Sequence, residues 1–314
     1  MIQPNYGRLT GLVAATFTPF QHDGAINIAR IPPMVDYLIE QQIRGLYVLG
    51  STGEGVSLTT DQRKQVAAAF VAATQGRIPV IVQVGCESLA AAADLAAHAQ
   101  QIGADAVSAV SPVYFKPDTV ESLVDSMAQI ASAAPNLPFY YYHIPGATGL
   151  AHSPLAFLEA AKQRIATLRG IKFTSPAVQD YQACIESAGD EYEVLWGLDE
   201  MLLSGLTAGG TSAVGSTYNF APAVYHHLMQ AFEQDQTDEA RLWQSRSQQL
   251  VRAFVPFGPR AAQKAIMAMI GQDCGPSRLP IRSLMPEAIE QLRSHLEEIG
   301  FFQWSHLAPI STSS

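Results

Sequence analysis

The hydrophobic residues of the chain fall into eight short runs, and each run precedes a segment whose apolar positions recur at helical spacing. Near-continuous runs rich in Val, Ile and aromatic residues are typical of strands that are buried on both faces. Their starts lie roughly 30 residues apart, which is the length of one βαβ unit. We therefore expect strands at 11–19, 45–50, 79–85, 106–112, 138–145, 169–174, 192–198 and 211–217.

Several of the intervening segments carry signals for the start of a helix. Thr60-Asp61 stands before QRKQVAAAFVAAT, Ser88 before LAAAADLAAHAQQ, and Ser153-Pro154 before LAFLEAAKQR. The side chains of Ser, Thr and Asp accept hydrogen bonds from the free N–H groups at a helix start, and Pro suits the first helical position. Strands and helices are thus predicted to alternate.

Eight parallel strands with helices outside predict an α/β protein with a closed (β/α)8 fold, a TIM barrel. An open doubly wound sheet is the alternative. After residue 217 the strand pattern stops, and helices are expected near 221–234, 237–256, 259–271 and 286–299. Because no Gly/Ser linker intervenes, we expect a catalytic barrel at 1–217 and a helical extension at 218–314 that packs on it.

Composition narrows the classes of function. The net charge of -9 and the absence of a basic patch argue against a nucleic-acid partner. No secretory signal or membrane span is evident, so a soluble cytoplasmic protein is expected. The cysteines, Cys86, Cys184 and Cys274, are odd in number and widely spaced, which favours buried thiols over disulfides or a zinc site. The histidine spacing predicts no metal site either.

Polar residues gather where the predicted strands end, which is where TIM barrels carry their chemistry. Lys172 stands inside the apolar run RGIKFT, and a buried ammonium costs several kcal/mol unless it is paired or used. A desolvated lysine has a lowered pKa and can attack a ketone to form a Schiff base. Tyr142, assisted by hydroxyls such as that of Thr52, is the predicted proton shuttle. The structural alternatives are a lysine that extends to solvent and a tyrosine that only packs in the core.

Two further segments have both a functional and a structural interpretation. In GSTGEG at 50–55, Ser51, Thr52 and their amides fit a carboxylate better than a phosphate, because the full phosphate-loop pattern is absent. A conformational role for the glycines is the alternative. Asp199 and Glu200 are either ligands for hydroxyls or ordinary acidic residues at a helix start.

With these residues in place, the sequence resembles the family of pyruvate-dependent class I aldolases that includes the dihydrodipicolinate synthases and the N-acetylneuraminate lyases. The resemblance covers nearly the whole chain and is strongest to the lyases. It rests on GLVAATFTPF at 11–20, GSTGEG at 50–55, IGADAVSAVSP at 102–112, PFYYYHIP at 138–145, GIKFT at 170–174, GLDEMLLSGLTAGGTSAVGSTYN at 197–219 and KAIM at 264–267.

The resemblance implies a role for each matching residue. Lys172 is similar to the Schiff-base lysine and Tyr142 to the general acid/base, while Ser51 and Thr52 match the pair that binds the pyruvate carboxylate. Tyr114 matches a tyrosine that many members contribute across a subunit interface. The positions that match contacts to the sugar portion lie on the last three strands, namely Thr174, Gly197, Asp199, Glu200, Gly215 and Ser216.

Two places discriminate within the family. The synthases usually carry an arginine after the fifth strand, where this chain reads Pro-Gly-Ala-Thr-Gly at 145–149, and they usually have Thr where Ser51 stands. The resemblance therefore implies a homotetrameric lyase that cleaves N-acetylneuraminate to N-acetylmannosamine and pyruvate without metal or cofactor. An aldolase of 2-keto-3-deoxy sugar acids is the alternative, ahead of a dihydrodipicolinate synthase. A non-catalytic protein that binds pyruvate or a sugar acid is the rival from another class.

Overall fold

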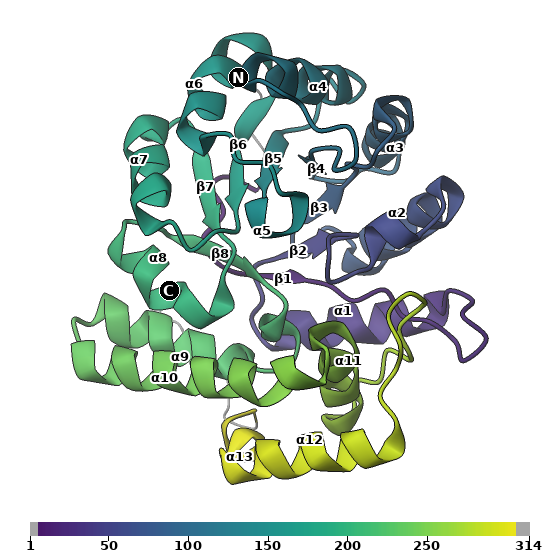
Figure 1. The fold of residues 1–314 in the computed structure, drawn as a ribbon, viewed down its shortest axis with the longest axis vertical. Coiled ribbons are helices and arrows are strands. Elements are labelled where there is room, and N and C mark those ends of the chain that lie inside the picture. Colours follow the sequence, from purple (N-terminus) through teal and green to yellow (C-terminus); the bar gives the residue numbers. More distant parts are fainter. Residues whose placement is uncertain (1–5, 306–314) are drawn as a thin grey trace.

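A computed structural model describes residues 6–305 and contains eight parallel strands that close into a barrel (Figure 1). Neighbours in sequence are neighbours in the sheet, and the last strand pairs with the first, which confirms the predicted TIM barrel. Each strand lies within its predicted run except the sixth, which begins one residue earlier. The strands are β1 (Gly11–Ala15), β2 (Gly45–Val48), β3 (Val80–Gln83), β4 (Ala106–Val110), β5 (Phe139–His143), β6 (Leu168–Phe173), β7 (Glu193–Trp196) and β8 (Ser212–Gly215).

Except for the short helix that follows β5, the helices between the strands surround the barrel (Figure 1). Ser88 and Ser153 are N-caps, as predicted. The predicted cap at Thr60-Asp61 is wrong by one residue, because Thr59 forms a capping box with Gln62 and this reciprocal pair fixes the helix start. These helices are α1 (Ile31–Glu40), α2 (Thr60–Thr74), α3 (Leu89–Gln101), α4 (Val120–Ser132), α5 (Pro145–Thr148), α6 (Pro154–Arg164), α7 (Val178–Ala188) and α8 (Leu202–Thr207).

The helices after β8 form the predicted extension. They are α9 (Pro222–Glu233), α10 (Thr237–Phe254), α11 (Pro259–Met269), α12 (Pro286–Glu298) and the unpredicted short α13 (Phe301–Ser305). In Figure 1, α9 and α10 lie side by side, and α9 packs against both α8 and β1. The boundary at 217/218 remains a prediction. Across residues 6–305 no helix has the length and apolar character needed to cross a membrane.

Alternation along the strands produces two separate hydrophobic cores. Tyr140 and Tyr142 belong to the core inside the barrel, whereas Tyr141 packs in the larger core between strands and helices. On β6, Ile171 and Phe173 also belong to the outer core. Because side chains on a strand alternate between its faces, Lys172 must point into the barrel. Pairing of β5 with β6 then places Lys172 directly beside Tyr142.

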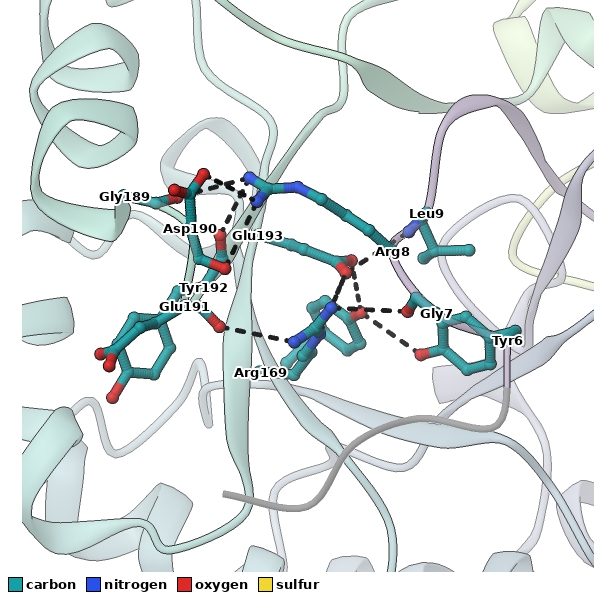
Figure 2. A network of polar contacts seen from close by, with 11 residues as sticks. Tyr6, Gly7, Arg8, Leu9, Arg169, Gly189, Asp190, Glu191, Tyr192 and Glu193 are labelled. Carbon is teal, nitrogen blue, oxygen red and sulfur yellow. Dashed lines mark hydrogen bonds and ion pairs between the residues drawn. The ribbon is translucent and has the colours of Figure 1, made fainter.

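A network of polar contacts closes the end of the barrel at which the strands begin (Figure 2). Arg169 Nε donates to Glu193 Oε1 at 3.0 Å, and the Tyr140 hydroxyl donates to Glu193 Oε2 at 2.7 Å. The segment before β1 joins this network through Tyr6, whose hydroxyl lies 3.4 Å from that of Tyr140, and through the Leu9 amide, which donates to Glu193. Both carboxylate oxygens of Glu193 therefore accept hydrogen bonds, so the Arg169–Glu193 ion pair has partners in addition to itself.

Candidate active site

Lys172 occupies the opposite half of the barrel interior, with only 4% of its surface exposed. Its Nζ donates a 3.3 Å hydrogen bond to Thr174 Oγ1 and lies 3.6 Å from the centre of the Tyr142 ring. The ring of Tyr47, which the sequence did not nominate, lies 4.8 Å from the same nitrogen and packs edge-on against Tyr142. Within residues 6–305 no carboxylate forms an ion pair with Lys172.

The pKa values of Lys172 and Tyr142 both lie below their ordinary values. Burial lowers the pKa of Lys172, and the neighbouring Tyr142 only partly opposes this effect. Burial by itself would raise the pKa of Tyr142, but the charge of Lys172 and hydrogen bonding to Lys172, Ser51 and Thr174 outweigh it. The pair thus combines an amine that loses its proton readily with a phenol that ionises readily.

The loop after β2 supplies the predicted Ser51 and Thr52 to the rim of the barrel. Thr52 is buried, while Ser51 is exposed and helps to lower the pKa of Tyr142. Glu54 is held in the left-handed backbone region at φ 54° and forms a buried ion pair with Lys264 of α11 at 3.0 Å. Lys264 Nζ also donates to the carbonyl of Thr18. The extension therefore fixes the loop that carries Ser51 and Thr52.

Asp199 follows β7 and is buried. Its Oδ2 accepts hydrogen bonds from the backbone amide of Thr217 at 2.9 Å and from the Thr217 hydroxyl at 2.7 Å. Burial raises the pKa of Asp199 to about 6, and the two bonds from Thr217 limit that rise. A Cβ at Gly215 would lie 2.0 Å from Asp199 Oδ1, so glycine is required for this approach. A Cβ at Gly197 would likewise lie 2.0 Å from Thr174 Oγ1.

Hydrogen bonds connect Asp199 to the helical extension. The hydroxyls of Thr217 and Tyr225 are 2.6 Å apart, and Ser247 Oγ lies 3.1 Å from the Tyr225 hydroxyl. Ser247 also donates to the carbonyl of Asp199 at 3.1 Å. Thr217 ends the predicted eighth strand, where polar groups were expected to converge. The sequence did not nominate Tyr225 or Ser247, because single polar residues in amphipathic helices carry no motif.

The remaining predicted residues are distributed unevenly. Glu200 is half-buried next to Asp199, and Ser216 accepts a hydrogen bond from Gln263 of α11 at 2.9 Å. Tyr114 is 81% exposed, and its ring packs edge-on against Phe115 rather than joining the group around Lys172. No cluster of three His, Cys, Asp or Glu that could hold a metal occurs within residues 6–305.

Comparisons with known proteins agree with the fold. The model of the dihydrodipicolinate synthetase family matches residues 8–299. N-acetylneuraminate lyase A of Xenopus laevis is 44% identical over 88% of this chain and 92% of its own, and human N-acetylneuraminate lyase is 37% identical over 96% and 95%. The structure of Proteus mirabilis N-acetylneuraminate lyase, 37% identical, superimposes with a TM-score of 0.91 over 94% of this chain and all of its own. The chain therefore belongs to the dihydrodipicolinate synthetase family.

Proposed function

We propose that the protein cleaves N-acetylneuraminate to N-acetylmannosamine and pyruvate through a Schiff base on Lys172. The observation that carries the proposal is the pairing of Lys172 with Tyr142. The lysine is buried and lacks a carboxylate partner within residues 6–305, and its Nζ lies 3.6 Å from the centre of the Tyr142 ring. The pKa of Tyr142 is lowered. The activity named for the relatives from Xenopus laevis, human and Proteus mirabilis supports this choice of substrate.

The reaction begins with the neutral amine of Lys172, whose pKa burial lowers. It attacks the ketone carbon, C2, of the open-chain sugar acid, and a carbinolamine forms. Tyr142 protonates the departing oxygen, water leaves, and an iminium remains on Lys172. The phenolate that results is the base for the next step, and its lowered pKa makes that form accessible.

Cleavage follows when the Tyr142 phenolate accepts the proton of the C4 hydroxyl. The C4–O electrons form the aldehyde of N-acetylmannosamine, the C3–C4 bond breaks, and its electron pair moves into the iminium to give an enamine. The enamine takes a proton at C3, which Tyr142 returns, and water releases pyruvate from Lys172. The protein supplies both the electron sink and the proton carrier, so this sequence uses no metal or organic cofactor.

Substrate binding is assigned by the chemistry of the surrounding groups. Ser51 and Thr52 bind the carboxylate of the pyruvate portion with hydroxyls and backbone amides. Asp199 and Glu200 accept hydrogen bonds from sugar hydroxyls, since an ionised carboxylate is an acceptor only. The remaining contacts come from residues that border these groups, namely Thr174, Gly197, Gly215 and Ser216.

We also propose that the protein is a cytoplasmic homotetramer in which Tyr114 reaches the site of a neighbouring subunit. The 81% exposure of Tyr114 and the 84% exposure of Phe115 support this, because adjacent large aromatic side chains exposed on one loop are typical of an interface. The backbone amides of Val113 and Tyr114 both donate to Glu87, at 2.9 and 3.1 Å, which holds the loop in place.

The test measures pyruvate release from N-acetylneuraminate by the purified protein and by Lys172→Ala. We expect release by the wild type only. Borohydride reduction in the presence of pyruvate should also fix an adduct on the peptide that contains Lys172. A pyruvate adduct without cleavage of N-acetylneuraminate would support the Schiff-base chemistry and direct the search to 2-keto-3-deoxy sugar acids. Binding of pyruvate or the sugar acid with neither an adduct nor cleavage would identify a non-catalytic protein.

A further inference from the structure

Arg260 lies at the second residue of α11, where the extension meets the barrel, and its side chain is half-buried. Its Nη1 donates to Gln263 Oε1 at 3.1 Å, and Gln263 Nε2 donates to Ser216 Oγ at 2.9 Å. Gln263 is itself buried, so this relay fixes the guanidinium to the residue that follows β8. Arg260 is thereby held at the rim of the candidate site.

Within the part of the chain that the structure describes, most N–H donors of the Arg260 guanidinium have no hydrogen-bond partner. Among residues 6–305 no carboxylate forms an ion pair with Arg260, and Gln263 uses one of its five N–H groups. Burial lowers the pKa of Arg260, although the charges of Tyr142 and Asp199 act in the opposite direction. A partly desolvated guanidinium without a counter-ion is costly, and a ligand that accepts its hydrogen bonds removes that cost.

The neighbouring groups restrict what this ligand can be. The charge of Asp199 acts on Arg260, and Glu200 follows Asp199 directly, so a second anionic group on the substrate would be repelled. The single carboxylate of the sugar acid already has a proposed place at Ser51 and Thr52. An uncharged oxygen that only accepts hydrogen bonds is therefore the best match for Arg260. The carbonyl oxygen of an N-acyl group has this property, whereas hydroxyls also suit the carboxylates of Asp199 and Glu200.

We propose that Arg260 is a specificity-determining residue that donates hydrogen bonds to the N-acyl oxygen of the sugar acid. The inference rests on the proposed function and adds to it the residue that selects N-acylated nonulosonic acids over deaminated ones. Arg260 and the acidic pair then divide the sugar between them. The carboxylates accept from hydroxyls, and the guanidinium donates to the amide oxygen.

The experiment compares kcat/KM for N-acetylneuraminate with that for the analogue that has a hydroxyl in place of the N-acetylamino group at C5. A hydrogen bond from a charged donor corresponds to roughly ten- to hundredfold in an equilibrium constant. We expect Arg260→Met to lose about that factor on N-acetylneuraminate and less than about threefold on the analogue. Arg260→Lys keeps the charge without the planar fork, so it should recover only part of the preference.

Arg252→Met, which removes an exposed arginine of α10, is the matched control. Normal borohydride trapping of pyruvate by Arg260→Met verifies that the variant folds and that Lys172 still reacts. Equal losses on both substrates, or no loss on either, would overturn the inference while leaving the proposed function intact. A wild-type protein that traps pyruvate but cleaves neither compound would refute the proposed substrate, and the inference with it.

Discussion

Two cations, Arg169 and Lys172, lie inside the barrel only three positions apart on β6. An irregularity in the pairing with β5, where Phe139 pairs with Leu168 but Tyr140 with Gly170, breaks the alternation and lets both side chains face inward. Their surroundings differ in kind. Arg169 near the start of the strand bonds Glu193 and is close to the backbone of residues 7 and 191 (Figure 2). Lys172 near the end of the strand has the hydroxyl of Thr174 and two aromatic rings around it. Burial lowers the pKa of both side chains, but Glu193 outweighs that effect for Arg169 and raises its pKa above the ordinary value.

The difference separates a cation that stabilises the fold from one for which we propose a chemical role. Removing one partner of a buried ion pair exposes the other to an uncompensated desolvation cost, so the Arg169–Glu193 pair is needed for a stable barrel. An ammonium buried without a counter-ion instead costs free energy in the folded state. Lys172 therefore opposes folding, and its presence requires a function. This agrees with the division of TIM barrels into a stabilising and a catalytic end.

The sharpest test of this contrast replaces Lys172 by methionine. Lys172→Met should lower turnover by about 10⁴-fold or more, because no other group forms the Schiff base. The same change should raise the free energy of unfolding by about 1 kcal/mol or more, since an apolar side chain replaces an unpaired ammonium. Pyruvate release and urea unfolding measure the two effects. A variant that is inactive and also less stable would show that Lys172 supports the fold.

A second test concerns the partner of Lys172. Tyr142→Phe keeps the ring that packs on Tyr47 and removes only the hydroxyl, so we expect kcat to fall about 10²- to 10⁴-fold while the protein folds normally. Borohydride trapping should slow as well, because the same hydroxyl protonates the departing oxygen. Tyr141→Phe, altered in the outer core, is the control. Full activity in Tyr142→Phe would remove this residue from the proposed mechanism.

The opposite end of the barrel should respond in stability alone. Arg169→Met leaves Glu193 buried without its ion-pair partner, and such a loss costs about 3 to 5 kcal/mol of unfolding free energy. We expect kcat/KM to be unchanged at temperatures where the variant remains folded. The double variant Arg169→Met with Glu193→Gln should recover part of the loss, because it removes the stranded charge. A fall in kcat/KM for the folded variant would contradict the separation of the two ends.

Much of the fold was predictable, because strand position depends on local apolar patterning. The roles of Lys172 and Tyr142 could also be predicted, since a polar residue in an apolar run is itself a signal and alternation determines which face of the strand it occupies. The network at the start of the strands was not predicted. It depends on Arg169 and Glu193 meeting across two strands, and the Tyr6 hydroxyl joins it from 134 residues before Tyr140.

Contributions from the helical extension were missed for the same reason. Arg260 and Gln263 stand in an amphipathic helix whose sequence indicates only packing, and their approach to Ser216 depends on how α11 docks on the barrel. Ser247 of α10 donates directly to the Asp199 carbonyl, and Tyr225 of α9 is connected to Asp199 through Thr217. The N-cap of α2 was predicted one residue too late, at Thr60-Asp61, because both threonines suit a helix start. Only the capping box with Gln62 selects Thr59.

Asp199 provides the smallest predicted effect and combines both sides of the contrast, because it is buried like Glu193 yet belongs to the site. Its pKa rises from 3.8 in an unfolded chain to about 6 in the fold, so the folded state binds the proton more tightly. Stability should therefore decline as pH rises from about 4 to about 6, by about 3 kcal/mol in total. Asp199→Asn keeps an oxygen for Thr217 and should remove that decline.

Urea unfolding from pH 4 to 7 gives the difference in unfolding free energy between the Asp199→Asn variant and the wild type, with the exposed Asp238→Asn on α10 as control. A constant difference across this range would mean that the Thr217 hydrogen bonds fully compensate the buried charge, and Asp199 would then resemble Glu193 at the stabilising end.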